Sequence, residues 1–157
     1  MTLEFSAETL AKFEEIIARY PRKEAAMLPV LYLAQQEFGH LGQEAIEYVA
    51  QLMGQSPATV HGVVSFYTML NTKPIARHHI QVCRTLPCAL QGAEKLTSFI
   101  SKMLGIEVGQ TTADRRFTLS EVECLASCGT APMMQINDDY YENLTDEKVM
   151  EILRSLG

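Results

Sequence analysis

Apolar side chains recur at helical spacing through the first half of the chain. In the first of these runs, Ser6 is a candidate N-cap and Pro21 is a stop signal. The apolar positions between them share one face of a helix, and they are Leu10, Phe13, Ile16, Ile17 and Tyr20. This pattern predicts an amphipathic helix that buries that face against other helices.

Two further runs continue the pattern. Residues 27–38 form an apolar run that ends at Gly39, and Pro29 either starts this helix or kinks it. The next run ends at Gly54 and places its apolar residues on one face, at Ile46, Val49, Ala50 and Met53. Both runs predict helices that pack against the first.

A fourth helix is predicted to begin at Ser56, an N-cap residue, with Pro57 at the first helical position. It leads into residues 63–70, VVSFYTML, where most apolar side chains are expected in a core. The aromatic and methionine content there exceeds what a small bundle needs, so part of it is predicted to be a partner surface, centred on Phe66, Tyr67 and Met69. Residues 1–73 are therefore predicted to form a helical bundle.

The pattern changes near residues 71–74, NTKP. Strand character then appears in three segments, and a turn leads into a fourth; these lie at residues 78–83, 116–124, 133–137 and 137–141. Helices are predicted over residues 93–104 and after Thr145. This order predicts an α/β domain over residues 74–157 with a mixed sheet of about four strands, compatible with a thioredoxin-like arrangement. The fold class is therefore α+β, a helical bundle followed by that domain.

Composition narrows the function classes. The chain has 157 residues, is 47% apolar and 20% charged, and can bury a proper core without disulfide staples. Its net charge of −6 argues against a nucleic-acid surface. The beginning of the sequence resembles no targeting signal, and no apolar run is long enough to span a bilayer. We therefore expect a cytoplasmic protein without direct membrane insertion, in which thiols stay reduced.

Four cysteines form two close pairs, Cys83 with Cys88 and Cys124 with Cys128. Each pair follows a predicted strand, and loops at strand ends are where scaffolds present ligands. If both loops leave the same edge of one sheet, the four sulfur atoms come together. This arrangement predicts a metal or redox site.

The spacing favours one kind of site over others. Structural zinc usually takes Cys-x2-Cys pairs, so these pairs are wide for it. Neither pair is the Cys-x-x-Cys of a dithiol oxidoreductase, and no histidine lies near them to complete a Rieske centre. A [2Fe–2S] cluster needs two thiolates for each iron, which two separated pairs supply. The cluster is favoured, with zinc second and unliganded or disulfide-bonded thiols third.

Other charged and polar side chains offer less to such a site. Arg84 is the cation within the first cysteine loop, and it either offsets cluster charge or is a solvated surface residue. The histidines are not expected to bind metal: His78 and His79 should meet solvent before a strand, and His61 should pack on a helix. No glycine-rich dinucleotide fingerprint is present, so NADH or flavin binding by this chain has no basis in the sequence.

Residues 82–96, VCRTLPCALQGAEKL, together with residues 117–145, FTLSEVECLASCGTAPMMQINDDYYENLT, closely resemble a known family. It is the small [2Fe–2S] subunit of the NADH-dehydrogenase module of respiratory complex I. Residues 28–41 and 60–70 resemble its N-terminal helical segments, so the likeness covers nearly the whole chain. Similar subunits occur in NAD-linked formate dehydrogenases and NAD-reducing hydrogenases.

The resemblance implies a role for each part. It implies that Cys83, Cys88, Cys124 and Cys128 hold a [2Fe–2S] cluster, each pair on one iron. A partner subunit would carry FMN and the NADH site, and the cluster would take one electron from the reduced flavin, off the main line of clusters toward quinone. The chain would then belong to NADH:quinone oxidoreductase without an active site of its own. It would lie with further iron–sulfur subunits at the cytoplasmic face of the inner membrane.

One departure from the family pattern falls in the second cysteine loop. The family usually reads Cys-Leu-Gly-Ala-Cys, whereas this chain has Ala126 and Ser127 between the cysteines. The loss of glycine matters if position 126 needs a positive φ, which alanine tolerates poorly. Ser127 adds a hydroxyl that we expect to hydrogen-bond to a sulfur atom and raise the reduction potential.

Overall fold

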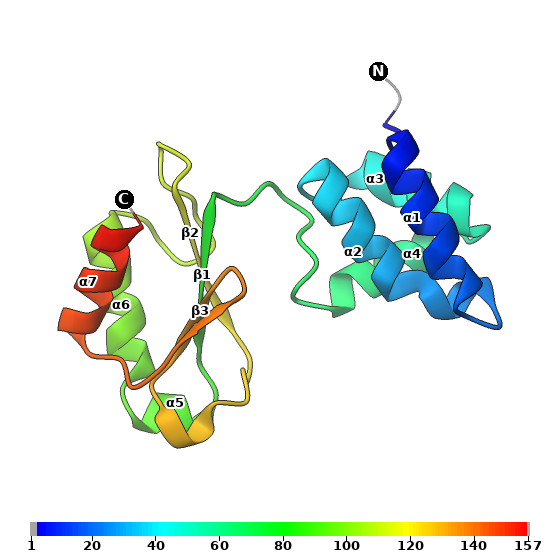
Figure 1. Cartoon of the computed structure of the whole chain (residues 1–157). Coiled ribbons are helices and arrows are strands. Elements are labelled where there is room, and N and C mark those ends of the chain that lie inside the picture. The colour runs from blue at the N-terminus through cyan, green and yellow to red at the C-terminus, as the bar shows by residue number, and fades with distance from the viewer. Residues whose placement is uncertain (1–2, 157) are drawn as a thin grey trace. The chain divides into compact units, whose positions relative to one another are not determined.

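The structure is a computed structural model that describes residues 3–156. Its contacts divide the chain into two compact units, one up to Pro74 and one from Ile75 (Figure 1). The first is helical and the second combines a sheet with helices, which confirms the predicted α+β class. The division into a helical domain over residues 1–73 and an α/β domain over residues 74–157 remains a prediction.

The first unit consists of helices whose ends follow local signals. Its elements are α1 (Ala7–Ala18), a 3₁₀ turn η1 (Lys23–Ala26), α2 (Met27–Phe38), α3 (Gln43–Met53) and α4 (Pro57–Phe66). Gly39 and Gly54 take left-handed conformations directly after α2 and α3, as C-terminal glycines do. Pro29 lies in the first turn of α2, where a missing N–H costs no hydrogen bond, so it helps to start this helix.

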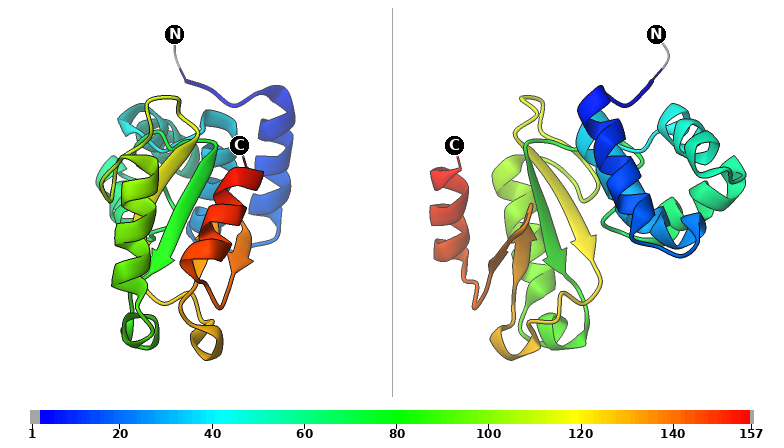
Figure 2. Two further views of the ribbon diagram at one scale, coloured as in Figure 1. Left: turned by 90° about the vertical axis from the view of Figure 1, so that its left-hand side faces the viewer. Right: turned by 45° about the vertical axis from the view of Figure 1, so that its right-hand side comes forward.

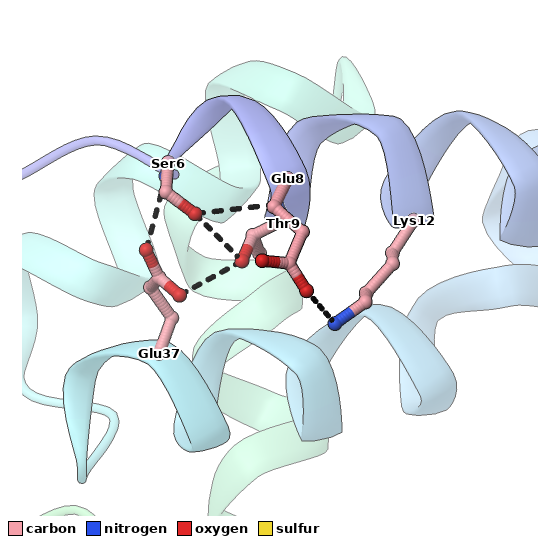
Figure 3. Close-up of polar contacts among 5 residues, drawn as sticks. All are labelled: Ser6, Glu8, Thr9, Lys12 and Glu37. Atoms are coloured by element: carbon pink, nitrogen blue, oxygen red, sulfur yellow. Dashed lines mark hydrogen bonds and ion pairs between the residues drawn. The ribbon is translucent and has the colours of Figure 1, made fainter.

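The first turn of α1 is fastened to α2 by a polar network (Figure 3). Ser6 caps α1, because its Oγ accepts a hydrogen bond from the Thr9 backbone N–H at 3.2 Å. Glu37 of α2 accepts from the Ser6 N–H at 3.0 Å and from the Thr9 hydroxyl at 2.8 Å. These bonds, that of Thr9 first, hold the pKa of Glu37 below its ordinary value.

The predicted apolar stripe of α1 was only partly right. Phe13 is buried, but Leu10 is 42% exposed and Tyr20, beyond the end of the helix, is 38% exposed. Thr9 is buried in the first turn, where its hydroxyl is satisfied by Glu37. In α3, by contrast, all the predicted positions are buried; they are Ile46, Val49, Ala50 and Met53.

The second unit is built on a four-stranded mixed sheet. Its elements are β1 (His78–Cys83), α5 (Leu86–Leu90), α6 (Ala93–Leu104), β2 (Phe117–Val122), η2 (Cys128–Thr130), β3 (Met134–Ile136), β4 (Asp139–Tyr141) and α7 (Asp146–Ser155). The strand order is β2-β1-β3-β4, with β1 parallel to β2 and the other pairs antiparallel. Helices α6 and α7 lie on the same face of the sheet (Figure 2). The mixed sheet of four strands was predicted correctly.

The strand register separates an apolar face from a polar one. Ile80 pairs with Leu119 on one side and Ile136 on the other, and all three are buried. Alternate residues point to the opposite face, which therefore carries Gln81, Ser120 and other polar side chains. The apolar face packs into the core that includes Leu96 and Ile100 of α6 and Val149 of α7.

The predicted exposure of three histidines was wrong. His78 and His79 are the first residues of β1 and both are buried; the His78 ring lies 5.4 Å from that of Phe117, and His79 Nε2 lies 2.9 Å from Ser120 Oγ. Burial lowers the pKa of His79. His61, expected to pack on a helix, is exposed.

None of the described helices has the length and apolar character needed to cross a membrane.

Candidate iron–sulfur site

The two cysteine loops leave the sheet at the same edge. Cys83 is the last residue of β1, and Cys124 follows shortly after the end of β2. These strands are parallel, and Cys83 is in register with Val122. The geometry expected from the sequence, two loops at one sheet edge, is therefore present.

The first pair lies in the core at this edge. Cys83 and Cys88 are both buried, and Cys88 sits on α5, a short helix that the sequence pattern did not predict. Burial, followed by the neighbouring Cys83, raises the pKa of Cys88 to about 11. Burial also acts to raise the pKa of Cys83, but hydrogen bonds, first among them that of Thr85, outweigh it and lower this pKa. Of the two thiols, Cys83 is thus the one more readily deprotonated.

The second pair is open to solvent. Cys124 and Cys128 are exposed, and their sulfur atoms lie 3.7 Å apart. The Ala126 backbone N–H donates to Cys124 Sγ at 3.3 Å and lowers the pKa of Cys124. The hydrogen bond with Cys124 makes the largest contribution to raising the pKa of Cys128.

The two pairs form one neighbourhood. Cys83 and Cys88 are hydrogen-bonded to each other. Negative charge on Cys128, in the other pair, also raises the pKa of Cys88. Among residues 3–156, no three or more His, Cys, Asp or Glu side chains are gathered closely enough to hold a metal ion between them. Two thiols for each of two irons is the donor set of a [2Fe–2S] cluster, and the arrangement of two adjacent pairs fits that group.

Ala126 has a left-handed backbone. Its φ is +61°, a conformation that glycine adopts freely and alanine does not. The family that this chain resembles usually has glycine at position 126. Because the backbone there has a positive φ, the replacement of glycine by alanine affects the loop. The conformation also accompanies the bond from the Ala126 N–H to the Cys124 sulfur.

The expectation for the Ser127 hydroxyl was wrong. Ser127 Oγ is hydrogen-bonded to a Glu142 carboxylate oxygen, and it lies 2.7 Å from Thr130 Oγ1. The hydroxyl therefore binds oxygen atoms of the following segments instead of a sulfur. Glu142 is brought to it by the chain beyond β4, which local sequence does not reveal.

Arg84 links the two cysteine loops at the surface. Its Nη2 lies 2.6 Å from Glu123 Oε1, and both side chains are mostly exposed. The hydrogen bond with Glu123 is the largest contribution that raises the pKa of Arg84. Arg84 is thus paired with a carboxylate, and an ion pair this exposed contributes little to stability.

Thr85 is a site residue that the sequence pattern did not predict. Its Oγ1 lies 3.2 Å from Cys83 Sγ, and its hydroxyl also lowers the pKa of Cys124. It therefore lies close to both pairs. The sequence feature that could have indicated this role is a threonine two positions after a cysteine, at the start of a loop.

Exposed leucines adjoin the first pair. Leu86 is 70% exposed and Leu90 is 76% exposed, at the two ends of the short helix that carries the buried Cys88. Both are large apolar side chains beside a site whose second half is also open to solvent. Such a surface is typical of one that a partner covers.

Comparison with known proteins agrees with this geometry. A protein of Rickettsia conorii, named as one of the subunits of NADH-quinone oxidoreductase, is 46% identical over 155 residues, covering 97% of this chain and 93% of that protein. The protein NADH dehydrogenase (ubiquinone) flavoprotein 2, mitochondrial, from Dictyostelium discoideum is 45% identical, covering 96% of this chain and 62% of that protein.

The fold has a match among solved structures. A chain in the crystal structure of an NAD⁺-reducing [NiFe]-hydrogenase in the air-oxidized state superposes with a TM-score of 0.72 at 22% identity, covering 83% of this chain and 22% of that chain. This likeness concerns the fold.

The family model that matches describes a thioredoxin-like [2Fe–2S] ferredoxin, and it spans residues 13–157. Membership of this family implies an iron–sulfur cluster. With the two thiol pairs at one sheet edge and a relative that matches over nearly its full length, the chain belongs to the thioredoxin-like [2Fe–2S] ferredoxin family.

Proposed function

We propose that this chain is an electron-transfer subunit of an NADH–quinone oxidoreductase, with a [2Fe–2S] cluster held by Cys83, Cys88, Cys124 and Cys128. The observation that carries the proposal is the convergence of both thiol pairs at one edge of the sheet. The choice of complex rests on the names of relatives that are 45–46% identical to this chain.

Each pair would hold one iron, Cys83 with Cys88 and Cys124 with Cys128. When bound, such a cluster accepts and releases a single electron. Four thiolates bring negative charge that this acidic chain must offset locally. The Ala126 N–H and the Thr85 hydroxyl lie against sulfur atoms and can supply part of that compensation.

The flavin and the NADH site would lie on a partner subunit. The basis is the lack of a glycine-rich dinucleotide fingerprint in the sequence, together with the exposed apolar residues beside the first thiol pair. The partner would cover Leu86 and Leu90 and bring its flavin within reach of the cluster. Further iron–sulfur subunits would complete the complex, at the cytoplasmic face of the inner membrane.

A second candidate is the same role in an NAD-reducing hydrogenase or an NAD-linked formate dehydrogenase. The superposition on a hydrogenase chain favours it as far as the fold goes. Purifying the chain from its host and identifying the associated subunits distinguishes these complexes, since a nickel-containing or molybdenum-containing partner would replace the proposed assignment.

The cluster is tested by single Cys→Ser substitutions at the four positions. The purified wild-type chain should contain iron and labile sulfide and absorb in the visible, and each variant should lose the cluster or hold it far less stably. A colourless wild-type chain that contains zinc would establish a structural zinc module instead. A variant with unchanged iron content and spectrum would remove that cysteine from the ligand set.

A further inference from the structure

Thr85 occupies the N-cap position of α5 but does not cap it. Ser6, Ser56 and Thr145 each accept a hydrogen bond from the backbone N–H three residues later, whereas Thr85 makes no side-chain cap bond. A threonine at an N-cap normally uses its hydroxyl oxygen in this way. Here the hydroxyl is directed elsewhere.

The sequence of α5 limits the donors available for a cap at Thr85. An N-cap oxygen accepts from the second or third residue of the helix. The second residue of α5 is Pro87, which has no N–H, so one of the two donors is missing. The N–H three residues after Thr85 belongs to Cys88 and remains available, yet Thr85 makes no cap bond, so its hydroxyl is free for another partner.

That partner is sulfur. Thr85 Oγ1 lies 3.2 Å from Cys83 Sγ, within hydrogen-bond distance for a sulfur acceptor. Thr85 is half-buried, so solvent competes only partly for its hydroxyl.

We propose that Thr85 is a positioning residue of the iron–sulfur site, whose hydroxyl donates an O–H···S hydrogen bond to the Cys83 thiolate and raises the reduction potential of the cluster. The inference rests on the proposed function, since it needs a cluster on these cysteines. A thiolate ligand has no proton, so the hydroxyl must be the donor. One-electron reduction adds a negative charge that is shared by the sulfur atoms, and a donor to sulfur therefore stabilises the reduced form more than the oxidised form.

The experiment compares three variants of the full chain with its cluster. Thr85→Val removes the hydroxyl and keeps the branched shape, while Thr85→Ser keeps the hydroxyl. Thr145→Val is the matched control, because Thr145 is also an N-cap and its Oγ1 accepts from the Lys148 N–H at 3.3 Å. Redox titration, visible and electron paramagnetic resonance spectra, and thermal melting are measured for each protein.

We expect Thr85→Val to lower the reduction potential, Thr85→Ser to stay close to wild type, and Thr145→Val to leave the potential unchanged. The melting temperature should show the reverse pattern. It should fall more for Thr145→Val, which loses a helix cap, than for Thr85→Val, which loses none. A Thr85→Val potential equal to that of the wild type, or a Thr145→Val shift of the same size, would overturn the proposal. A wild-type chain that holds no cluster would instead refute the proposed function.

Discussion

Ala126 shows how a single backbone angle bears on the site. A left-handed conformation costs a residue with a Cβ about 1–2 kcal/mol, and Ala126 adopts it at a φ of +61°. The loop keeps this conformation between two proposed ligands, and there the Ala126 N–H reaches the Cys124 sulfur at 3.3 Å. The strain and the hydrogen bond to sulfur thus occur at the same residue.

We predict that Ala126→Gly stabilises the chain by about 1 kcal/mol, because glycine removes the left-handed penalty and loses part of the gain to its greater freedom when unfolded. Chemical denaturation measures the effect. Ala89→Gly is the matched control, since Ala89 is exposed within α5 and glycine should weaken the helix there. If Ala126→Gly destabilised the protein as much as the control does, backbone strain at position 126 would be refuted.

At the scale of elements, the second cysteine loop is tied to the segment after β4. Ser127 Oγ is bonded to Glu142, and the Asn143 N–H donates to the Thr130 carbonyl at 2.7 Å. Thr130 Oγ1 also donates back to the Ser127 carbonyl at 3.1 Å. These bonds hold the Cys124–Cys128 loop from one side, although none of them touches a sulfur.

We predict that Ser127→Ala lowers the free energy of unfolding by up to about 1 kcal/mol, the contribution of one partly exposed hydrogen bond. Ser98→Ala, on the exposed side of α6, should not destabilise the chain. If Ser127 acts through Glu142, Glu142→Ala should have a similar cost, and the double variant should cost little more than either single one. Fully additive losses would show that the two side chains act separately.

At the scale of the whole molecule, several large apolar side chains are exposed. Phe66 is 76% exposed and Met69 is 44% exposed, in and just after α4, and the Phe66 ring lies 5.0 Å from that of Tyr67. In the second unit, Leu86 and Leu90 are exposed beside Cys88. These residues stay out of both cores, so their burial by a partner would be a gain on assembly.

We predict that Phe66→Asp and Leu90→Asp leave the melting temperature nearly unchanged and weaken association with the flavin-binding subunit, because each places a charge in a surface that assembly would bury. Leu10→Asp is the control, since Leu10 is also exposed on a helix of the first unit. Co-purification and thermal melting are the measurements. If a variant associates like the wild type, its residue lies outside the docking surface of its unit. If a variant unfolds, its residue supports the fold.

NADH oxidation gives a further check on this assignment. If the dinucleotide site lies on the partner, as proposed, the isolated chain should neither bind nor oxidise NADH, even with an added electron acceptor. Activity of the chain alone would contradict the subunit role.

Local sequence was sufficient for most elements of the fold and for the candidate ligands. Helix starts at Ser6, Ser56 and Thr145 and the helix ends at Gly39 and Gly54 depend on bonds and angles within a few residues, so the sequence determined them. The cysteine pairs were likewise visible as spacing at strand ends. Short elements such as α5 were not predicted, because a helix of about one turn has too few residues to show a periodic apolar pattern.

Contacts between distant segments were decided only by the tertiary structure. His79 is buried because β1 lies beside β2 and meets Ser120, and Ser127 turns from sulfur to Glu142 because the chain returns there after β4. The donors to sulfur, by contrast, are local: Thr85 lies two residues from Cys83, and Ala126 lies two residues from Cys124. The candidate ligands could thus be found from the sequence, whereas the hydrogen-bond partners of His79 and Ser127 could not. A hydrogen bond needs two groups within about 3 Å, and for groups far apart along the chain only the packed fold brings them to that distance.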